Sequence, residues 1–439
     1  MNTTLFYLLK TLRFFILFFG TLAVAQAQLT YPKEKIYSPY TIANEAAVKR
    51  RADVIKKAND LNILPIGKDE ESSFNLEVGL WGISQFMVRT PQSDSGIARL
   101  VKNYDALKES TQRALLEAVY ALYPSDFISD MKSVANMATH PRNFAMAALH
   151  VYRAQPNDQT RQWVVQAMRK VQANEKQQVM LQCLTRYVYG DKPSPLPSAD
   201  SLFARQMIHG FKMIYSFHRA NRNYPGLAIV QNPDGSFARD SMGQLKVFVQ
   251  LARSGSNLPY FLTNGSTPQG LFTITGTGIS QNVFIGPTPN LQSAMMHEVT
   301  PAVFAHYFPI VYNAPPEKIY RSYFPENWQT WSGLMEAFDA GRIGRGEIIA
   351  HGSTIDPEWF SGETYYPLTP SLGCLSGLEI WNKQTGRIDR SDQLDLVNTF
   401  LETKGKTGFL LVINLDDKKA PVSREEIEAM VTKFELGAL

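Results

Sequence analysis

The chain has 439 residues, of which 44% are hydrophobic and 11% are aromatic, and its formal net charge is +4. This composition is ordinary for a globular protein and leaves ample apolar material for packed cores. The net charge is small for this length, so it allows mild attraction to an anionic wall polymer and argues against a nucleic-acid partner.

The first residues have the pattern of a secretory signal peptide, residues 1–27. An apolar run over residues 14–24 follows two basic residues, and Ala25-Gln26-Ala27 supplies the small-x-small pattern that a signal peptidase recognises. We expect cleavage after Ala27 and therefore an exported protein that is periplasmic or associated with the cell wall. The apolar run is shorter than the roughly 20 residues of a membrane span, so we expect no stable span after cleavage. A retained signal anchor is the alternative.

After cleavage the chain is longer than one hydrophobic core usually serves, so we expect two domains. In the first half, STQRALLEAVYAL has apolar residues at helical spacing, with Ser110 at the N-cap. Similar amphipathic stretches cover residues 127–137, 141–154, 158–171 and 174–187. Such helices can stack as an irregular solenoid, although no strict repeat period is present. We predict an all-helical domain over residues 28–199, with a protein partner as its candidate ligand.

The composition changes at residues 190–199 (GDKPSPLPSA), where three prolines mark a linker or boundary. Strand patterns follow at residues 226–230, 245–251, 272–275, 347–350 and 409–415. Helices are expected near residues 295–307, 328–340 and 423–434, the last opening with a capping box of Ser423 and Glu426. We therefore predict an α+β protein whose second domain, residues 200–439, is mostly β with helical insertions.

Only two cysteines occur, Cys183 and Cys374. An exported protein can oxidise such a pair to a disulfide, which is the alternative to a free thiol at Cys374. The two cysteines lie far apart in segments of different character, which favours two free thiols. Cys183 falls in a predicted helix, where we expect it to be buried and inert.

Three segments of the second domain combine into a candidate catalytic site. GSTPQGLFTI (265–274) is a turn punctuated by glycine and proline that leads into a strand, and IIAHGS is a short apolar strand ending at His351. SLGCL places Cys374 directly after Gly373. A thiol attacks as its thiolate, and an adjacent imidazole can remove the thiol proton. The backbone amides around Gly373 and Cys374 can donate to a developing oxyanion.

These segments resemble the signature of L,D-transpeptidase (YkuD-like) catalytic domains. TPQGLF (267–272) is similar to the T-P-x-G-x-F turn of that family, and His351-Gly followed by Ser371-x-Gly-Cys is similar to its His…Ser/Thr-x-Gly-Cys signature. The order along the chain also agrees, and the resemblance covers roughly residues 227–415 without reaching the helical half. It implies a YkuD-like β-sandwich for the catalytic domain.

The resemblance implies a role for each residue of the signature. Cys374 would be the acylated nucleophile and His351 its base. The carbonyl of Gly352 would orient the imidazole, Ser371 would supply the hydroxyl that shapes the cysteine loop, and Gly373 would serve a tight turn. No metal or organic cofactor is implied.

The same resemblance implies a peptidoglycan stem peptide as the substrate. Cys374 would attack the carbonyl of an L-residue next to a terminal D-amino acid, which leaves as a thioester forms. An amine would resolve the thioester into a new cross-link, whereas water would make the enzyme a carboxypeptidase or hydrolase. Two other classes stay open: a catalytically silent wall-binding module, and a helical interaction scaffold that the second domain attaches to the wall.

The sequence departs from this family in two places. Leu372 and Ser376 stand where the family often has a histidine and a polar Asn or Arg. The stretch between His351 and Cys374 is longer than usual and rich in aromatic residues; it is either a lid or substrate wall, or a surface loop. Its candidate substrate-binding residues are Trp359, Glu363, Tyr365 and Tyr366.

The remaining histidines give no metal-binding signature. His297, Glu298 and His306 lack the two-histidine helix spacing of a zinc protease, so we expect structural side chains there. The glycines of residues 276–278 lack the Lys-Ser/Thr end of a phosphate-binding loop.

Overall fold

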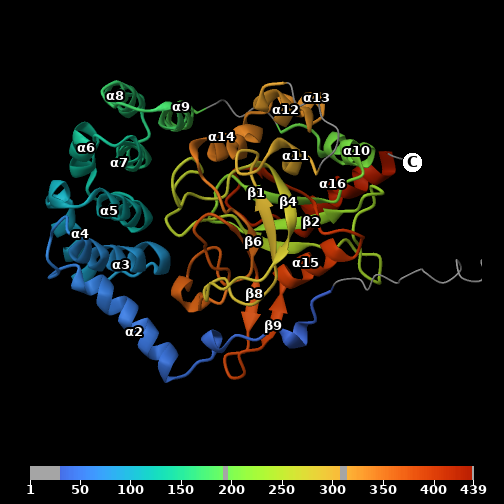
Figure 1. Ribbon diagram of the computed structural model, residues 1–439, viewed down its shortest axis with the longest axis horizontal. Coiled ribbons are helices and arrows are strands. Elements are labelled where there is room, and N and C mark those ends of the chain that lie inside the picture. The colour runs from blue at the N-terminus through green and yellow to red at the C-terminus, as the bar shows by residue number, and fades with distance from the viewer. Residues whose placement is uncertain (1–29, 191–195, 307–313, 438–439) are drawn as a thin grey trace, which may run out of the picture.

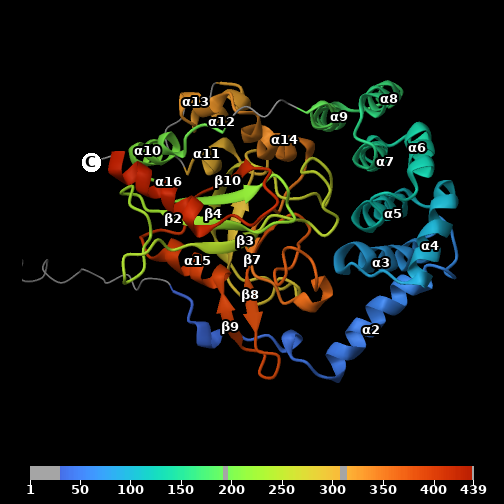
Figure 2. The same cartoon turned by 180° about the vertical axis from the view of Figure 1, so that it is seen from behind.

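The computed structural model describes residues 30–190, 196–306 and 314–437. These residues form a mixed α+β structure, in which a column of helices from the N-terminal half stands beside a β-rich C-terminal half (Figures 1 and 2). The predicted signal peptide, residues 1–27, lies outside the described residues. Within the described ranges, no helix is both long enough and apolar enough to cross a membrane.

The helical half is a stacked column, as the amphipathic stretches predict. Helices α3, α5, α7 and α9 form the row nearer the β-rich half and contact one another in that order, while α4, α6 and α8 lie outside them (Figure 1). The bounds are α2 Glu45–Asp60, α3 Glu70–Phe86, α4 Pro91–Lys102, α5 Glu109–Leu122, α6 Ile128–Met137, α7 Pro141–Ala154, α8 Asp158–Met168 and α9 Glu175–Tyr189.

Two predicted helix starts have different outcomes. The expected N-cap at Ser110 is wrong: α5 already begins at Glu109, and the Ser110 hydroxyl instead donates to Glu77 of α3 at 2.6 Å. The capping box at the start of the last helix is confirmed. Ser423 N donates to the Glu426 carboxylate at 2.9 Å, and Glu426 N donates back to the Ser423 hydroxyl at 3.3 Å.

Eight strands of the β-rich half close into a barrel in the order β1-β10-β4-β5-β6-β7-β3-β2. Their bounds are β1 Met213–Arg219, β2 Gly226–Gln231, β3 Phe248–Leu251, β4 Gly270–Gly278, β5 Asn290–Ala294, β6 Ala350–His351, β7 Leu375–Gly377 and β10 Gly408–Asp416. The pairs β1–β10 and β6–β7 are parallel. The mostly β second half is as predicted, but the resemblance implies a β-sandwich, whereas the pairing of β3 with β7 and of β1 with β10 joins all eight strands into one closed sheet.

Helices cover the barrel on several sides, and a short hairpin extends from it (Figure 1). The remaining elements are α10 Ala199–His209, α11 Pro301–Phe304, α12 Pro316–Ser322, α13 Glu326–Gln329, α14 Met335–Ile343, β8 Glu379–Trp381, β9 Ile388–Ser391, α15 Asp392–Leu401 and α16 Arg424–Gly437.

Strand β1 is buried on both faces. Tyr215 and Phe217 belong to a hydrophobic cluster that includes Phe203 of α10 and Phe434 of α16. Ile214 belongs to a second cluster, which includes residues of α15. Successive side chains of a strand point to opposite faces, so a strand between two cores is apolar at nearly every position.

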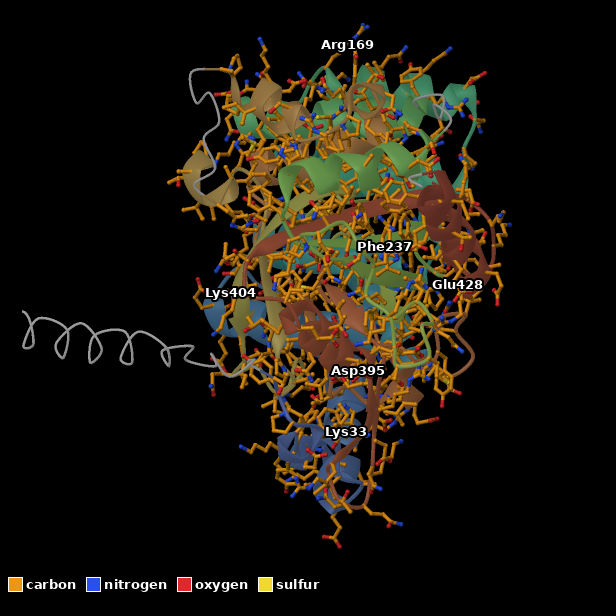
Figure 3. The ribbon with its side chains drawn as sticks, turned by 90° about the vertical axis from the view of Figure 1, so that its right-hand side faces the viewer. Lys33, Arg169, Phe237, Asp395, Lys404 and Glu428 are labelled. Atoms are coloured by element: carbon orange, nitrogen blue, oxygen red, sulfur yellow. The ribbon has the colours of Figure 1, made fainter. Side chains whose placement is uncertain are left out.

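The chain before α2 runs along the barrel rather than along the helical column. Tyr31 N donates to the Asn398 side chain of α15 at 2.8 Å, and Tyr37 forms a bridge with Arg387 near the β8–β9 hairpin. Figure 3 shows Lys33 on this side of the molecule, below Asp395 of α15. The first described residues of the predicted helical domain therefore pack on the β-rich half.

The two halves share one hydrophobic cluster. Leu80 and Ile83 of α3 belong to the same cluster as Leu258, Phe261 and Leu262 of the barrel loops. Because this cluster is continuous, the helical column is packed directly against the loops that carry the candidate site.

Candidate active site

Adjacent parallel strands carry the predicted base and nucleophile. Ala350 of β6 pairs with Leu375 of β7, and His351 pairs with Ser376. Leu375 N also donates to the carbonyl of Ile349 at 3.0 Å. Short apolar strands form here because β6 is buried between β5 and β7. The pairing brings together two residues that are distant in sequence, with Cys374 just before β7 and His351 at the end of β6.

The Cys374 thiol contacts the backbone that leads into β6. Its Sγ–H donates to the carbonyl of Glu347 at 3.4 Å, and Sγ accepts from Ile349 N at 3.5 Å. Burial raises the pKa of the Cys374 thiol to about 11, while the hydrogen bond from Ile349 and the charge of Arg345 act in the opposite direction. The resting thiol is therefore neutral at neutral pH.

The imidazole of His351 is buried, with 5% of its surface exposed, and its orientation is fixed by the backbone. Nδ1–H donates to the carbonyl of Gly352, the contact that the resemblance implies. A carbonyl only accepts, so the neutral ring carries its proton on Nδ1 and leaves Nε2 as the basic nitrogen. Burial lowers the pKa of His351, although this hydrogen bond opposes the effect. The imidazole is therefore neutral and able to accept a proton at neutral pH.

A buried carboxyl group supports the turn after His351. A Cβ at Gly352 would lie 2.3 Å from a Glu379 oxygen, so only glycine allows this approach. Glu379 accepts from Ser353 N at 2.8 Å and from the Ser391 hydroxyl at 2.8 Å. Burial raises its pKa to about 7. No local sequence pattern connects Glu379 with His351, so the sequence alone does not identify this residue.

The cysteine loop is held by two hydroxyl groups. Ser371 Oγ–H donates to the carbonyl of Cys374 at 2.8 Å and accepts from Gly373 N at 3.0 Å. Thr267, from the TPQG turn, donates to the carbonyl of Gly373 at 2.9 Å. Gly373 has φ of 125°, which favours glycine. The three sequence segments of the signature thus meet around Cys374.

Comparisons with known proteins add no relative. No family model matches the chain. The search of curated proteins finds no match, and neither does the search of solved structures.

The aromatic loop between His351 and Cys374 packs on the helical half. The Trp359 ring lies 5.0 Å from the ring of Phe86 in α3, and the guanidinium of Arg51 in α2 lies 3.9 Å from its centre. Tyr365 is fully buried, with the Arg253 guanidinium 4.9 Å from its ring centre. Of these two predicted substrate-binding side chains, Trp359 therefore contacts the helical half, whereas the contact of Tyr365 with Arg253 lies within the β-rich half.

The other two predicted loop residues face solvent. Tyr366 is 44% exposed, and its hydroxyl donates to Glu358 at 2.9 Å. Glu363 is exposed, and its backbone carbonyl accepts from Tyr366 N at 3.1 Å. The structure does not bring these side chains into the hydrogen-bond network of Cys374, so their predicted role in substrate binding stays a prediction.

Both cysteines are free, so the disulfide alternative is wrong. Cys183 is buried in α9, with 1% of its surface exposed, as predicted. Over the described ranges, no group of three or more His, Cys, Asp or Glu side chains is arranged to hold a metal ion. Nε2–H of His306 donates to the carbonyl of Gly408 at 2.8 Å, and the Thr273 hydroxyl lies 3.1 Å from the same nitrogen, so these are structural contacts.

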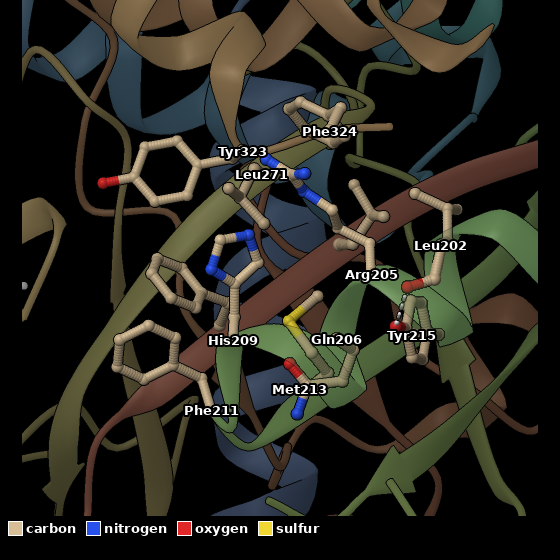
Figure 4. Close-up of a pocket in the computed structure, with 12 residues that line it drawn as sticks. Leu202, Arg205, Gln206, His209, Phe211, Met213, Tyr215, Leu271, Tyr323 and Phe324 are labelled. Carbon is tan, nitrogen blue, oxygen red and sulfur yellow. Dashed lines mark hydrogen bonds between the residues drawn. The ribbon is translucent and has the colours of Figure 1, made fainter. Parts of the chain in front are cut away.

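A separate hollow of about 40 Å³ lies against α10. Its walls include Leu202 and Gln206 of α10, Tyr215 of β1 and Phe324 after α12 (Figure 4). None of the predicted site residues lines this hollow. It is therefore distinct from the Cys374 site.

Proposed function

We propose that this protein is a cysteine-dependent acyltransferase of the L,D-transpeptidase type, and that its barrel is a closed variant of the YkuD-like catalytic domain. The observation that carries the proposal is the parallel pairing of β6 with β7. It sets Cys374 beside a strand that ends at His351, an imidazole whose Nδ1 is held by the next carbonyl. A nucleophile, a base and a group that orients the base are the parts that covalent acyl transfer needs.

The proposed substrate is a peptidoglycan stem peptide, as the resemblance implies. The Cys374 proton passes to Nε2 of His351, and the thiolate sulfur bonds to the carbonyl carbon of the L-residue. The imidazolium then protonates the departing nitrogen as the bond to the terminal D-amino acid breaks, which leaves a thioester. An incoming amine repeats these steps in reverse and forms a new amide. With water as the acceptor, the same thioester gives a carboxylic acid.

Two features of the resting site define what the reaction requires. The thiol hydrogen of Cys374 is directed to the Glu347 carbonyl, so the side chain has to turn toward His351 before the proton moves. The Gly373 amide already donates to Ser371, so we assign the developing oxyanion to the N–H of Cys374.

A catalytically silent wall-binding module is the second candidate. It is favoured by one observation: burial raises the pKa of Cys374 to about 11, so little thiolate is present at neutral pH. A neutral resting thiol is compatible with the proposed enzyme, because His351 removes the thiol proton during attack rather than beforehand.

Intact-mass spectrometry after exposure to a carbapenem tests the proposal. The mature protein and its Cys183→Ala variant are expected to gain one drug mass, because an activated thiol opens the β-lactam ring. The Cys374→Ala variant is expected to gain none. A folded, reduced protein that forms no adduct at Cys374 with the drug or with purified stem peptides would support the silent module instead.

A further inference from the structure

Arg345 is a partly buried cation that the sequence signature does not include. It lies between the end of α14 and β6, and its backbone N donates to Ala340 of α14 at 2.9 Å. Its guanidinium donates to the carbonyls of Gly265 at 2.8 Å and Ser266 at 3.1 Å, and also to the carbonyl of Tyr260. These bonds fix the side chain under the turn that precedes β4. The guanidinium therefore has a single defined position.

This cation has no carboxylate in contact. Among the described residues Arg345 forms no ion pair and its hydrogen-bond acceptors are neutral carbonyls, while the charge of Glu298 acts on it without direct contact. Burial lowers the pKa of Arg345 to about 10, so the side chain stays protonated at neutral pH. A partly buried charge with no carboxylate in contact is incompletely compensated, which makes an anion formed beside it favourable.

The nearest site for such an anion is Cys374. A Cβ at Gly373 would lie 2.3 Å from Nη2 of Arg345, so the guanidinium touches the residue directly before the cysteine. Two carboxylates act in the opposite sense. Glu347 and Glu298 both disfavour a negative charge on the sulfur, and Glu298 accepts from Glu347 N at 2.7 Å. One cation and two anions therefore act on the thiol.

We propose that Arg345 is a positioning residue that stabilises the thiolate of Cys374 when His351 removes its proton, against the opposing charges of Glu347 and Glu298. The proton moves from Sγ to Nε2, and no further reactant is needed. Arg345 keeps its own proton throughout. Its charge compensates the sulfur at the moment that the desolvated thiolate forms, which is where an electrostatic contribution is largest.

This inference concerns the thiol alone, so it can be tested without a cell-wall substrate. The measured quantity is the rate of alkylation of Cys374 by iodoacetamide at neutral pH, in full-length mature protein that carries Cys183→Ala. Thiolate absorbance in the ultraviolet, followed as the pH is raised and taken as the difference from a Cys374→Ala trace, gives a second measure, the pKa of the thiol. Failure of the carbapenem test with success here would reject the proposed reaction and leave the charge assignment in place.

Three variants separate charge from structure. Arg345→Met is expected to slow alkylation about tenfold, which corresponds to about one unit in the thiol pKa. Arg345→Lys keeps the charge and is expected to recover most of that loss. Glu347→Gln removes an exposed opposing charge while keeping its backbone, and is expected to accelerate alkylation about twofold, because solvent screens part of the effect.

Faster alkylation of the Glu347→Gln variant is the decisive readout, since loss of a purely structural contact does not increase thiol ionisation. A folded Arg345→Met protein with unchanged alkylation and unchanged thiolate absorbance would overturn the proposal. If Arg345→Met does not fold, the result rests on the other two variants. In that case, a Glu347→Gln protein with no gain in thiolate would overturn it equally.

Discussion

The junction of α9 with α14 and the junction of β6 with β7 each hold one cysteine, and they differ in the charge beside the thiol. Burial raises the pKa of both thiols to about 11. The Arg186 guanidinium lies 3.1 Å from Cys183 and forms an ion pair with Asp339, whereas Arg345 beside Cys374 has carbonyl partners. The two thiols are similarly desolvated, so the reactivity proposed for Cys374 depends on a cation that no carboxylate contacts, whereas the cation beside Cys183 is paired with Asp339.

The largest expected effect separates the two cysteines by function. Cys374→Ala should reduce release of the terminal D-amino acid from a stem peptide by roughly 10³-fold or more, because the thioester cannot form. Cys183→Ala should leave the rate nearly unchanged, because Cys183 is buried away from solvent. Product release measured by mass spectrometry checks both variants. Equal losses in the two proteins would remove the distinction between the junctions.

The second effect concerns pH and the base. Burial lowers the pKa of His351, so its neutral form persists below the ordinary histidine range. Acylation should therefore fall about tenfold per pH unit only below the usual histidine pKa of about 6.5. A pH profile of carbapenem acylation in single-turnover conditions measures this limb. A midpoint above the usual histidine value would contradict the assignment of a desolvated neutral base.

The third effect concerns the glycine turn after His351, a backbone feature that the Cys374 junction needs and the Cys183 junction does not. Gly352→Ala would place a Cβ 2.3 Å from a buried Glu379 oxygen, and should destabilise the protein by about 1–3 kcal/mol. Gly276→Ala is the matched control, since nothing lies within 4 Å of its Cβ position. Denaturant unfolding of both variants gives the difference. Equal stability of the two proteins would show that the turn after His351 can relax freely.

The signature in the sequence predicted much of this site because its parts are local. His351-Gly352 carries both the base and the carbonyl that orients it, and Ser371 reaches Cys374 across a single turn. Arg345 could not be found in the same way. Its three acceptors lie about 80 residues earlier in the chain, at separations of 79, 80 and 85 residues, and only the folded turn brings them under Gly373.

The fold shows the same contrast: elements with a local sequence pattern were predicted, whereas contacts between distant residues were not. The helices of the first half were predicted because their apolar residues recur at helical spacing. Strand β1 was not predicted, because its apolar residues at successive positions lack the alternation of a half-exposed strand. Closure of the barrel depends on β1 pairing with β10, whose partners Met213 and Phe409 are far apart in sequence. Trp359 packs on Phe86 for a similarly nonlocal reason.

The smallest expected effect comes from a variant in which the cation beside Cys183 loses its carboxylate partner, as at the Cys374 junction. Asp339→Asn removes the counter-charge of Arg186 and one cause of the raised pKa of Cys183. Arg186 is 42% exposed at its side chain, so the loss of the pair should cost only about 1 kcal/mol. The free energy of unfolding of Asp339→Asn, Arg186→Met and the double variant isolates the pair.

Alkylation of the same Asp339→Asn protein then distinguishes charge from access. Native Cys183 should stay unreactive toward iodoacetamide although its pKa falls, because only 1% of its surface is exposed. Cys374 in the same sample serves as the internal reference for an accessible thiol. Rapid labelling of Cys183 in the folded variant would mean that the counter-charge alone keeps it inert, and that the two junctions are equally open to reagents. Continued protection would mean that a reactive cysteine in this protein needs both an unpaired cation and an open path to the sulfur.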